Sequence, residues 1–164
     1  MSHPNDPQPS AEATLGDARV HVVGAGRMGA ALARNLRAAG VEVNGPLGRG
    51  ARGEGADIVL LAVPDAEIAA AAAALVPGPL VGHLSGATGL EPLRPHRAFS
   101  MHPLTSVAGA AHDFRGEYAA VDGSSAESLQ SAEMLARSLG MRTFRVRDRD
   151  RAAYHAAASI AANF

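Results

Sequence analysis

Residues 19–43, RVHVVGAGRMGAALARNLRAAGVEV, constrain the fold more than any other stretch of the chain. Valines indicate a short buried strand, and Gly24, Gly26 and Gly29 follow it as a G-x-G-x-x-G motif. Apolar side chains then recur every four residues, which predicts a helix with one buried face. A second valine-containing strand comes next. The order strand, glycine turn, helix and strand is typical of the first half of a dinucleotide-binding fold.

The remainder of the chain alternates between strand-like and helix-like segments. Further strands are expected at residues 57–64, 79–85, 98–104, 117–123 and 141–146, and further helices at 65–76, at 125–140 and from 148 onward. The glycine-rich residues 44–56 predict a loop. This alternation predicts an α/β fold: a Rossmann-like, mainly parallel sheet with helices on both faces.

Composition excludes several classes of site. The chain has no cysteine, which excludes disulfides, thiolate nucleophiles and cysteine-ligated metals. Its net charge of −1 gives no general attraction to nucleic acid or to a membrane, and no apolar run is long enough to span a bilayer. The arginines of residues 141–151 are interpreted as part of a solvated strand and helix start. The polar, proline-rich residues 1–17 predict a disordered leader that is not a signal peptide, so we expect a soluble cytoplasmic protein.

The glycine motif predicts where the phosphates of a dinucleotide would bind. Gly24 permits a tight turn, Gly26 lets the backbone approach the pyrophosphate, and Gly29 lets helix and strand pack closely. Free N–H groups at the helix N-terminus then face the phosphates. The backbone that follows the next buried strand, at Val63 and Pro64, is expected to border the same site. The predicted cofactor-binding residues of these two segments are Gly24, Ala25, Gly26, Arg27, Met28, Gly29, Val63 and Pro64.

The residues after the second strand bear on which dinucleotide binds. An NAD site usually has Asp or Glu about 20 residues after the first glycine. Counting from Gly24 instead reaches Asn44, which we place at the end of the second strand. Arg49 and Arg52 follow in the loop, and arginine favours the additional 2′-phosphate of NADP. We therefore predict NADP in preference to NAD, with Asn44 and Arg49 as further cofactor-binding residues.

Polar side chains end two of the predicted strands. His83 and Ser85 end one of these strands, and His102 ends the next. Because ligands bind beyond the carboxyl ends of the strands in open α/β sheets, we expect these side chains near the nicotinamide. A metal site built from the histidines has no H-x-x-x-H or H-E-x-x-H pattern to support it, and we predict none.

The last predicted helix carries His155, Ser159 and Asn163 at four-residue spacing, so the three side chains share one stripe. This stripe is either the solvent-exposed face of the helix or one wall of a cleft over the cofactor. On the second interpretation one histidine would supply a proton, because an ordinary imidazole titrates near neutral pH. The predicted catalytic residues are then His83, Ser85, His102, His155, Ser159 and Asn163.

Five stretches, VHVVGAGRMG, LLAVPD, GHLSGATGL, FSMHPL and YHAAASIAANF, resemble Rossmann-like oxidoreductases related to the deazaflavin-dependent NADP reductases. Pyrroline-5-carboxylate reductase, prephenate dehydrogenase and the β-hydroxyacid dehydrogenases are more distant relatives of that group. The resemblance covers residues 18–164. It implies a dinucleotide-binding domain at 18–147, followed at 148–164 by the first helix of an all-α domain. In such proteins the all-α domain supplies a homodimer interface and one wall of the active site, and this chain would lack most of it.

The resemblance also implies a role for the last helix. In β-hydroxyacid dehydrogenases this helix carries a catalytic lysine with an asparagine four residues later. Asn163 matches the asparagine, whereas Ser159 stands where the lysine would be. His83, His102 or His155 could supply the proton in place of a lysine, and the pattern does not select among them.

These observations predict an NAD(P)-dependent oxidoreductase that transfers hydride between a nicotinamide and a small-molecule substrate. The alternative is a non-catalytic dinucleotide-binding module, or an inactive fragment that needs a helical partner. Ala156, Ile160 and Phe164 form an apolar stripe beside the polar one, and without a second domain this stripe would be exposed.

Overall fold

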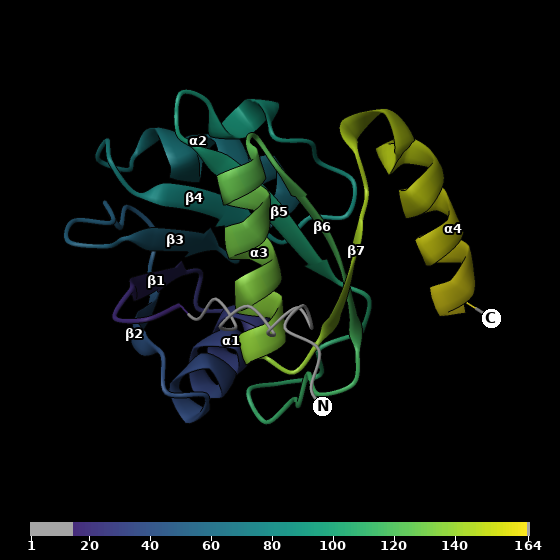
Figure 1. Cartoon of the computed structure of the whole chain (residues 1–164), viewed down its shortest axis with the longest axis horizontal. Helices are drawn as coiled ribbons and strands as arrows, with labels where there is room; N and C mark the ends of the chain where they lie inside the picture. Colours follow the sequence, from purple (N-terminus) through teal and green to yellow (C-terminus); the bar gives the residue numbers. More distant parts are fainter. Residues whose placement is uncertain (1–14, 164) are drawn as a thin grey trace, which may run out of the picture.

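The computed structural model describes residues 15–163, so most of the predicted leader lies outside the described residues. Over residues 15–163 the chain forms a seven-stranded sheet in the order β2-β1-β3-β4-β5-β6-β7 (Figure 1). The strands are β1 (Arg19–Val23), β2 (Glu42–Leu47), β3 (Ile58–Leu61), β4 (Leu80–His83), β5 (Ala98–Pro103), β6 (Tyr118–Gly123) and β7 (Arg142–Arg145). Strands β1 to β5 are parallel, β6 is antiparallel to β5, and β7 is parallel to β6. The predicted Rossmann-like α/β fold is confirmed.

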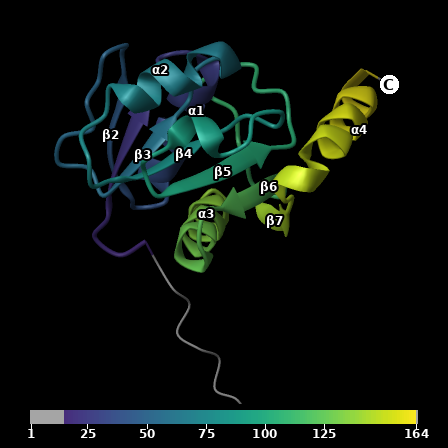
Figure 2. The same ribbon diagram turned by 90° about the horizontal axis from the view of Figure 1, so that it is seen from above.

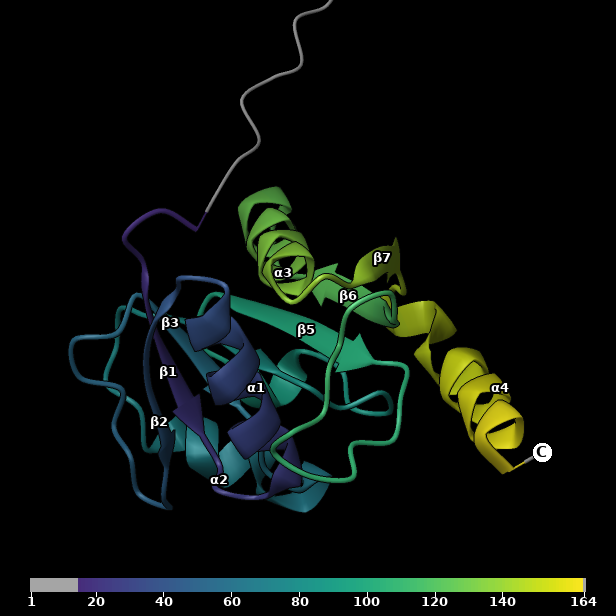
Figure 3. The same cartoon turned by 90° about the horizontal axis from the view of Figure 1, so that it is seen from below.

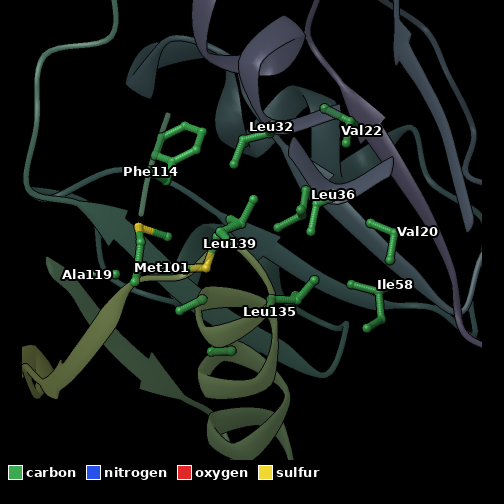
Figure 4. Close-up of a cluster of buried hydrophobic side chains, with 14 of the residues drawn as sticks. Val20, Val22, Leu32, Leu36, Ile58, Met101, Phe114, Ala119, Leu135 and Leu139 are labelled. Carbon is green, nitrogen blue, oxygen red and sulfur yellow. The ribbon is translucent and has the colours of Figure 1, made fainter. Parts of the chain in front are cut away.

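Helices cover both faces of this sheet. The helices are α1 (Arg27–Ala38), α2 (Ile68–Ala73), α3 (Ala126–Ser138) and α4 (Arg151–Asn163), of which the first three cover the faces. Helices α1 and α3 pack on one face through a buried cluster that includes Leu32, Leu36 and Leu135 (Figure 4). Helix α2 packs on the other face, and Figure 2 shows α2 and α3 on opposite sides of the strands. Because side chains alternate along a strand, the neighbours Val22 and Val23 enter different clusters.

Helix α4 lies beyond the β7 edge of the sheet and not on either face (Figure 1; Figure 3). A 3-10 turn at Asp148–Asp150 precedes it, so α4 begins at Arg151 and not at residue 148 as predicted. Within residues 15–163, none of the helices combines the length and the apolar character that crossing a membrane would require.

Several elements are shorter than predicted, among them β3 and β4, and the differences in β2 and α2 bear on the site. Strand β2 continues to Leu47 because the chain bulges at Gly45 and then pairs with β1 again. Gly45 has φ +132°, and a Cβ there would lie 2.5 Å from the carbonyl oxygen of Val22. Helix α2 is shorter than predicted at both ends: residues Asp65–Glu67 before it form a 3-10 turn, and after it the N–H of Val76 donates to the carbonyl oxygen of Arg52 at 2.8 Å.

Candidate functional site

The carboxyl ends of strands β1, β3, β4 and β5 lie along one edge of the sheet, because these strands are parallel. The glycine loop follows β1, Val63 and Pro64 follow β3, His83 ends β4, and His102 lies near the end of β5. The fold therefore gathers the predicted functional segments along one edge. Two separate cavities lie at this edge, one beside the glycine loop and one beside α4.

The first and third glycines of the motif sit where a side chain would collide with backbone. Gly24 has φ +120°, and a Cβ there would lie 2.1 Å from the carbonyl oxygen of Ala62. A Cβ on Gly29 would lie 1.8 Å from the carbonyl oxygen of Gly24. These distances match the tight turn and the close helix packing that the motif requires. Both glycines are therefore needed to build the loop, whether or not a ligand is bound.

Gly26 has a different environment, because a Cβ placed on it would meet no atom within 4 Å. It is the N-cap residue of α1 in an extended conformation, and no side chain caps the helix. The first N–H groups of a helix have no partner within the helix. The N-terminus of α1 therefore presents uncapped donors, together with the positive end of its dipole, beside a glycine with open space in front of it.

This space belongs to a cleft of about 620 Å³ between the glycine loop, the loop after β2 and the start of the segment after β3. Six of the predicted cofactor-binding residues line it, namely Gly24, Ala25, Gly26, Arg49, Val63 and Pro64. Alanines from α2 and the following turn form much of the remaining wall. Arg27 is exposed, Met28 packs against the core, and Gly29 is buried behind the loop. The cleft thus brings the glycine loop, the loop after β2 and the segment after β3 around one space.

Arg49 and Glu67 form an ion pair at this cleft. Arg49 is largely exposed and follows β2, whereas Glu67 is mostly covered and belongs to the 3-10 turn Asp65–Glu67 after β3. The pair therefore joins the two loops that flank the cleft. A carboxylate at this position was not anticipated from the sequence, although Glu67 lies only three residues after Pro64.

Asn44 does not end β2, contrary to the prediction. It lies within the strand, opposite His21 of β1, and it lines a separate cavity of about 290 Å³ together with Arg19 and Glu42. The positions directly after the strand belong to Gly48 and Arg49. Counting residues from Gly24 missed the end of the strand because the bulge at Gly45 adds to its length. Arg52 pairs with Glu54 and does not line the cleft beside the glycine loop.

His83 is fully buried, and both of its ring nitrogens are engaged. The backbone N–H of Ser85 donates to Nδ1 at 3.1 Å, and Nε2 lies 2.8 Å from the carbonyl oxygen of Gly89. Nδ1 therefore carries no hydrogen, and Nε2–H is the donor. Burial lowers the pKa of His83, so the ring stays neutral near neutral pH. This geometry suits a residue that shapes the 84–89 loop better than one that exchanges protons with a substrate.

Ser85 is also committed to local contacts. Its hydroxyl donates to Asp65 at 2.7 Å and accepts from the N–H groups of Ala87 and Thr88 at 3.2 and 2.9 Å. The side chain thus closes the turn after β4 and joins it to the segment after β3. Asp65 is the first residue of the predicted helix 65–76, and its contact with Ser85 spans 20 residues of chain.

His102 reaches the second cavity, which lies between the loop after β5 and helix α4. This cavity has a volume of about 390 Å³, and its polar lining consists of His102, Thr105, Ser106, His155 and Ser159. Asn163 is absent from this lining and donates instead to the carbonyl oxygen of Ser159 at 2.7 Å. The structure therefore brings together three of the six predicted catalytic residues and leaves His83, Ser85 and Asn163 outside the cavity.

Arg151 contradicts the interpretation of residues 141–151 as fully solvated. Its side chain is only 6% exposed, and it donates to the hydroxyl of the buried Ser100 at 3.0 Å and to Asp148 at 3.4 Å. The other arginines of this stretch are exposed. Arg151 therefore fixes the first turn of α4 to β5. The sequence carried no signal for this contact because Ser100 lies 51 residues away.

The described residues contain no group of three or more histidine, aspartate or glutamate side chains arranged to hold a metal ion. The candidate site has two parts: an uncapped helix N-terminus beside one cavity, and imidazole and hydroxyl groups around the other.

Comparisons with known proteins place this geometry in context. A family model described as a domain of unknown function, DUF2520, matches residues 117–164, and no curated protein matches the chain. A candidate NADP oxidoreductase from Bacteroides fragilis is similar in structure, with a TM-score of 0.76 and 19% identity over 92% of this chain and 69% of its own.

Two further solved structures carry a dinucleotide. Prephenate dehydrogenase from Aquifex aeolicus, in complex with NAD⁺ and hydroxyphenyl propionate, has a TM-score of 0.67 and 16% identity over 87% of this chain and 63% of its own. Pyrroline carboxylate reductase from Plasmodium falciparum, with NADP bound, has a TM-score of 0.65 and 13% identity over 93% of this chain and 67% of its own. The chain thus spans about two thirds of the length of these proteins. It has the Rossmann-like α/β fold that they share.

Proposed function

We propose that this chain binds a nicotinamide dinucleotide in the cleft beside the glycine loop and acts as part of an NADP-dependent oxidoreductase. The observation that carries the proposal is the open space at Gly26 beside the uncapped N-terminus of α1. Phosphate groups bind well at such a terminus because N–H donors and the helix dipole both face them. Structural neighbours that contain NAD⁺ or NADP support this assignment.

Arg49 favours NADP within this proposal. It lines the cleft directly after β2, where the ribose of the adenosine half lies in Rossmann folds. A guanidinium there can hold a 2′-phosphate by two hydrogen bonds. Glu67 would weaken the preference for NADP, because its carboxylate already pairs with Arg49 and would repel a phosphate.

A bound nicotinamide would supply the hydride chemistry, and the residues of this chain would position the substrate and supply a proton. Of the predicted catalytic residues, His102 is the one we assign to the proton. It lines the cavity beside α4 and, unlike His83, has a ring nitrogen, Nε2, without a hydrogen-bond partner among residues 15–163. Thr105, Ser106, His155 and Ser159 would bind the substrate around it.

A second candidate function is a dinucleotide-binding module that turns over substrate only when a helical partner or domain covers α4. Ile160 favours this possibility, because its side chain is 61% exposed on α4. A second copy of the chain, joined through α4 as in a homodimer, would be one such partner.

Dinucleotide binding is tested by calorimetric titration of the full chain with NADPH and NADH. Gly26→Val should weaken NADPH binding at least about 100-fold, equal to about 2.8 kcal/mol, because the side chain fills the space that a phosphate would occupy. The fold should survive, since a Cβ at Gly26 meets no atom within 4 Å. Gly109→Val is the matched control, because Gly109 has equally open surroundings and lies away from the cleft. Retained affinity in Gly26→Val, or equal loss in both variants, would refute the assignment of the cleft.

A further inference from the structure

His102 and Tyr154 join the sheet to α4 through a side-chain hydrogen bond. The Nδ1 atom of His102 on β5 lies 2.6 Å from the hydroxyl oxygen of Tyr154 on α4. The two rings meet edge to face, with centroids 5.7 Å apart and an angle of 84° between their planes. The two residues are 52 positions apart in the sequence, so only the folded chain brings them together.

Neighbouring residues restrict how both rings can move. The imidazole of His102 packs over Gly86, where an added Cβ would lie 2.8 to 3.0 Å from three ring atoms. The ring of Tyr154 packs against Phe144 of β7, with centroids 5.9 Å apart. With Nδ1 held by Tyr154, Nε2 is the ring nitrogen of His102 that remains available to a molecule in the cavity.

The surroundings set the protonation states of the pair. Burial raises the pKa of Tyr154 to about 12, so its hydroxyl stays protonated and can either donate or accept a hydrogen bond. Burial is also the main cause of the lowered pKa of His102; His155 and Arg151 of α4 lower it further, as does His83 of β4, whereas Asp65 raises it. His102 is therefore neutral at neutral pH and is able to take up a proton.

We propose that Tyr154 is a positioning residue for His102: its hydroxyl oxygen accepts a hydrogen bond from Nδ1–H of the neutral ring, which leaves Nε2 without a hydrogen, directed to the substrate cavity and able to take up a proton. This inference rests on the proposed function of His102. Proton uptake at Nε2 converts the neutral ring to an imidazolium with a hydrogen on each nitrogen. The Tyr154 oxygen accepts from Nδ1–H both before and after this uptake and keeps its own hydrogen. A neutral hydroxyl in this position stabilises the cation less than a carboxylate would, so the proton remains easy to release.

The test is a ¹⁵N NMR titration of the histidine rings in the full chain without dinucleotide. His102→Gln identifies the signals of His102. Tyr154→Phe keeps the aromatic ring and removes the hydroxyl, and Tyr118→Phe is the matched control. Tyr118 is the other tyrosine of the chain, is exposed, and has its hydroxyl next to Arg142. Tyr154→Phe should lower the pKa of His102 by about half a unit to one unit, because the imidazolium loses its acceptor. The ring should also change from one tautomer to a mixture.

Two outcomes would overturn the proposal: unchanged His102 signals in Tyr154→Phe, or an equal shift in Tyr118→Phe. A purely structural role for the hydroxyl would change the thermal midpoint but leave the tautomer in place. The affinity for NADPH should be the same in Tyr154→Phe and the wild type, because Tyr154 lies outside the dinucleotide cleft. If no dinucleotide binds to the wild type, the proposed function fails, while the NMR result still reports whether Tyr154 controls His102.

Discussion

The two cavities at the carboxyl edge of the sheet are built in different ways. The cleft beside the glycine loop is lined mainly by backbone, glycine and alanine, and its wall comes from several short segments within residues 23–74. The cavity beside α4 is lined by imidazole and hydroxyl groups from β5, the loop after it and α4. The shape of the first cavity therefore depends on the conformation of the backbone. The shape of the second depends on the contacts that hold α4 to the sheet.

This difference separates general binding from specific chemistry. A helix N-terminus and a glycine turn recognise phosphates, which all dinucleotides share. On the proposed function, selection between dinucleotides would depend on Arg49 and Glu67 at one cavity, and proton transfer on His102 at the other, with Tyr154 bonded to it. Substitutions in the two regions should therefore change different properties of the protein.

The largest effect is expected for Gly29→Ala. Its Cβ would lie 1.8 Å from the carbonyl oxygen of Gly24, so the glycine loop and α1 would have to separate. The free energy of unfolding should fall by about 2 to 4 kcal/mol, measured by urea denaturation, and NADPH affinity should fall with it. Gly109→Ala, at a position with open surroundings, should change neither quantity. Full stability in Gly29→Ala would show that the loop is not closely packed.

A smaller effect, confined to the other region, is expected for Arg151→Met. Methionine is similar in length to arginine but has no guanidinium, so the variant loses the buried hydrogen bond to Ser100 and the contact with Asp148. The free energy of unfolding should fall by about 1.5 to 3 kcal/mol, and the amide hydrogens of α4 should exchange faster. NADPH affinity should not change. Arg149→Met, which alters an exposed arginine two positions earlier, provides the comparison, and equal destabilisation there would contradict the anchoring role of Arg151.

The smallest effects are expected at the rim of the dinucleotide cleft. Arg49→Ala should weaken NADPH binding about tenfold and leave NADH nearly unchanged, because only NADPH carries the 2′-phosphate. Glu67→Gln should strengthen NADPH binding about threefold, since Arg49 then no longer pairs with a carboxylate. Both are measured by calorimetry at fixed salt. Equal losses for NADPH and NADH in Arg49→Ala would remove Arg49 from the recognition of the phosphate.

The same contrast explains how much the sequence could predict. The glycine loop was predictable because its residues are close in sequence and each glycine meets a local steric demand, as at Gly24 and Gly29. The end of β2 was not, because the bulge at Gly45 shifts the register by an amount that residue counting ignores. His102 could be placed at the end of a strand from its pattern.

Tyr154, the hydrogen-bond partner of His102, could not be predicted from a local pattern. Its contact with His102 depends on how β6 and β7 bring the chain back to β5. The burial of Arg151 was missed for the same reason: an arginine in a charged stretch gives no sign that a serine 51 residues earlier lies beneath it.

The attachment of α4 through its first turn has a mechanical consequence. Arg151 and Tyr154 hold the start of the helix, whereas Ser159 lies eight residues further along, about 12 Å away at the helical rise of 1.5 Å per residue. A tilt of about 10° around the first turn would therefore move Ser159 by roughly 2 Å. A molecule that packs against the exposed length of α4 could therefore change the distance between Ser159 and the loop after β5 without breaking the contacts of Arg151.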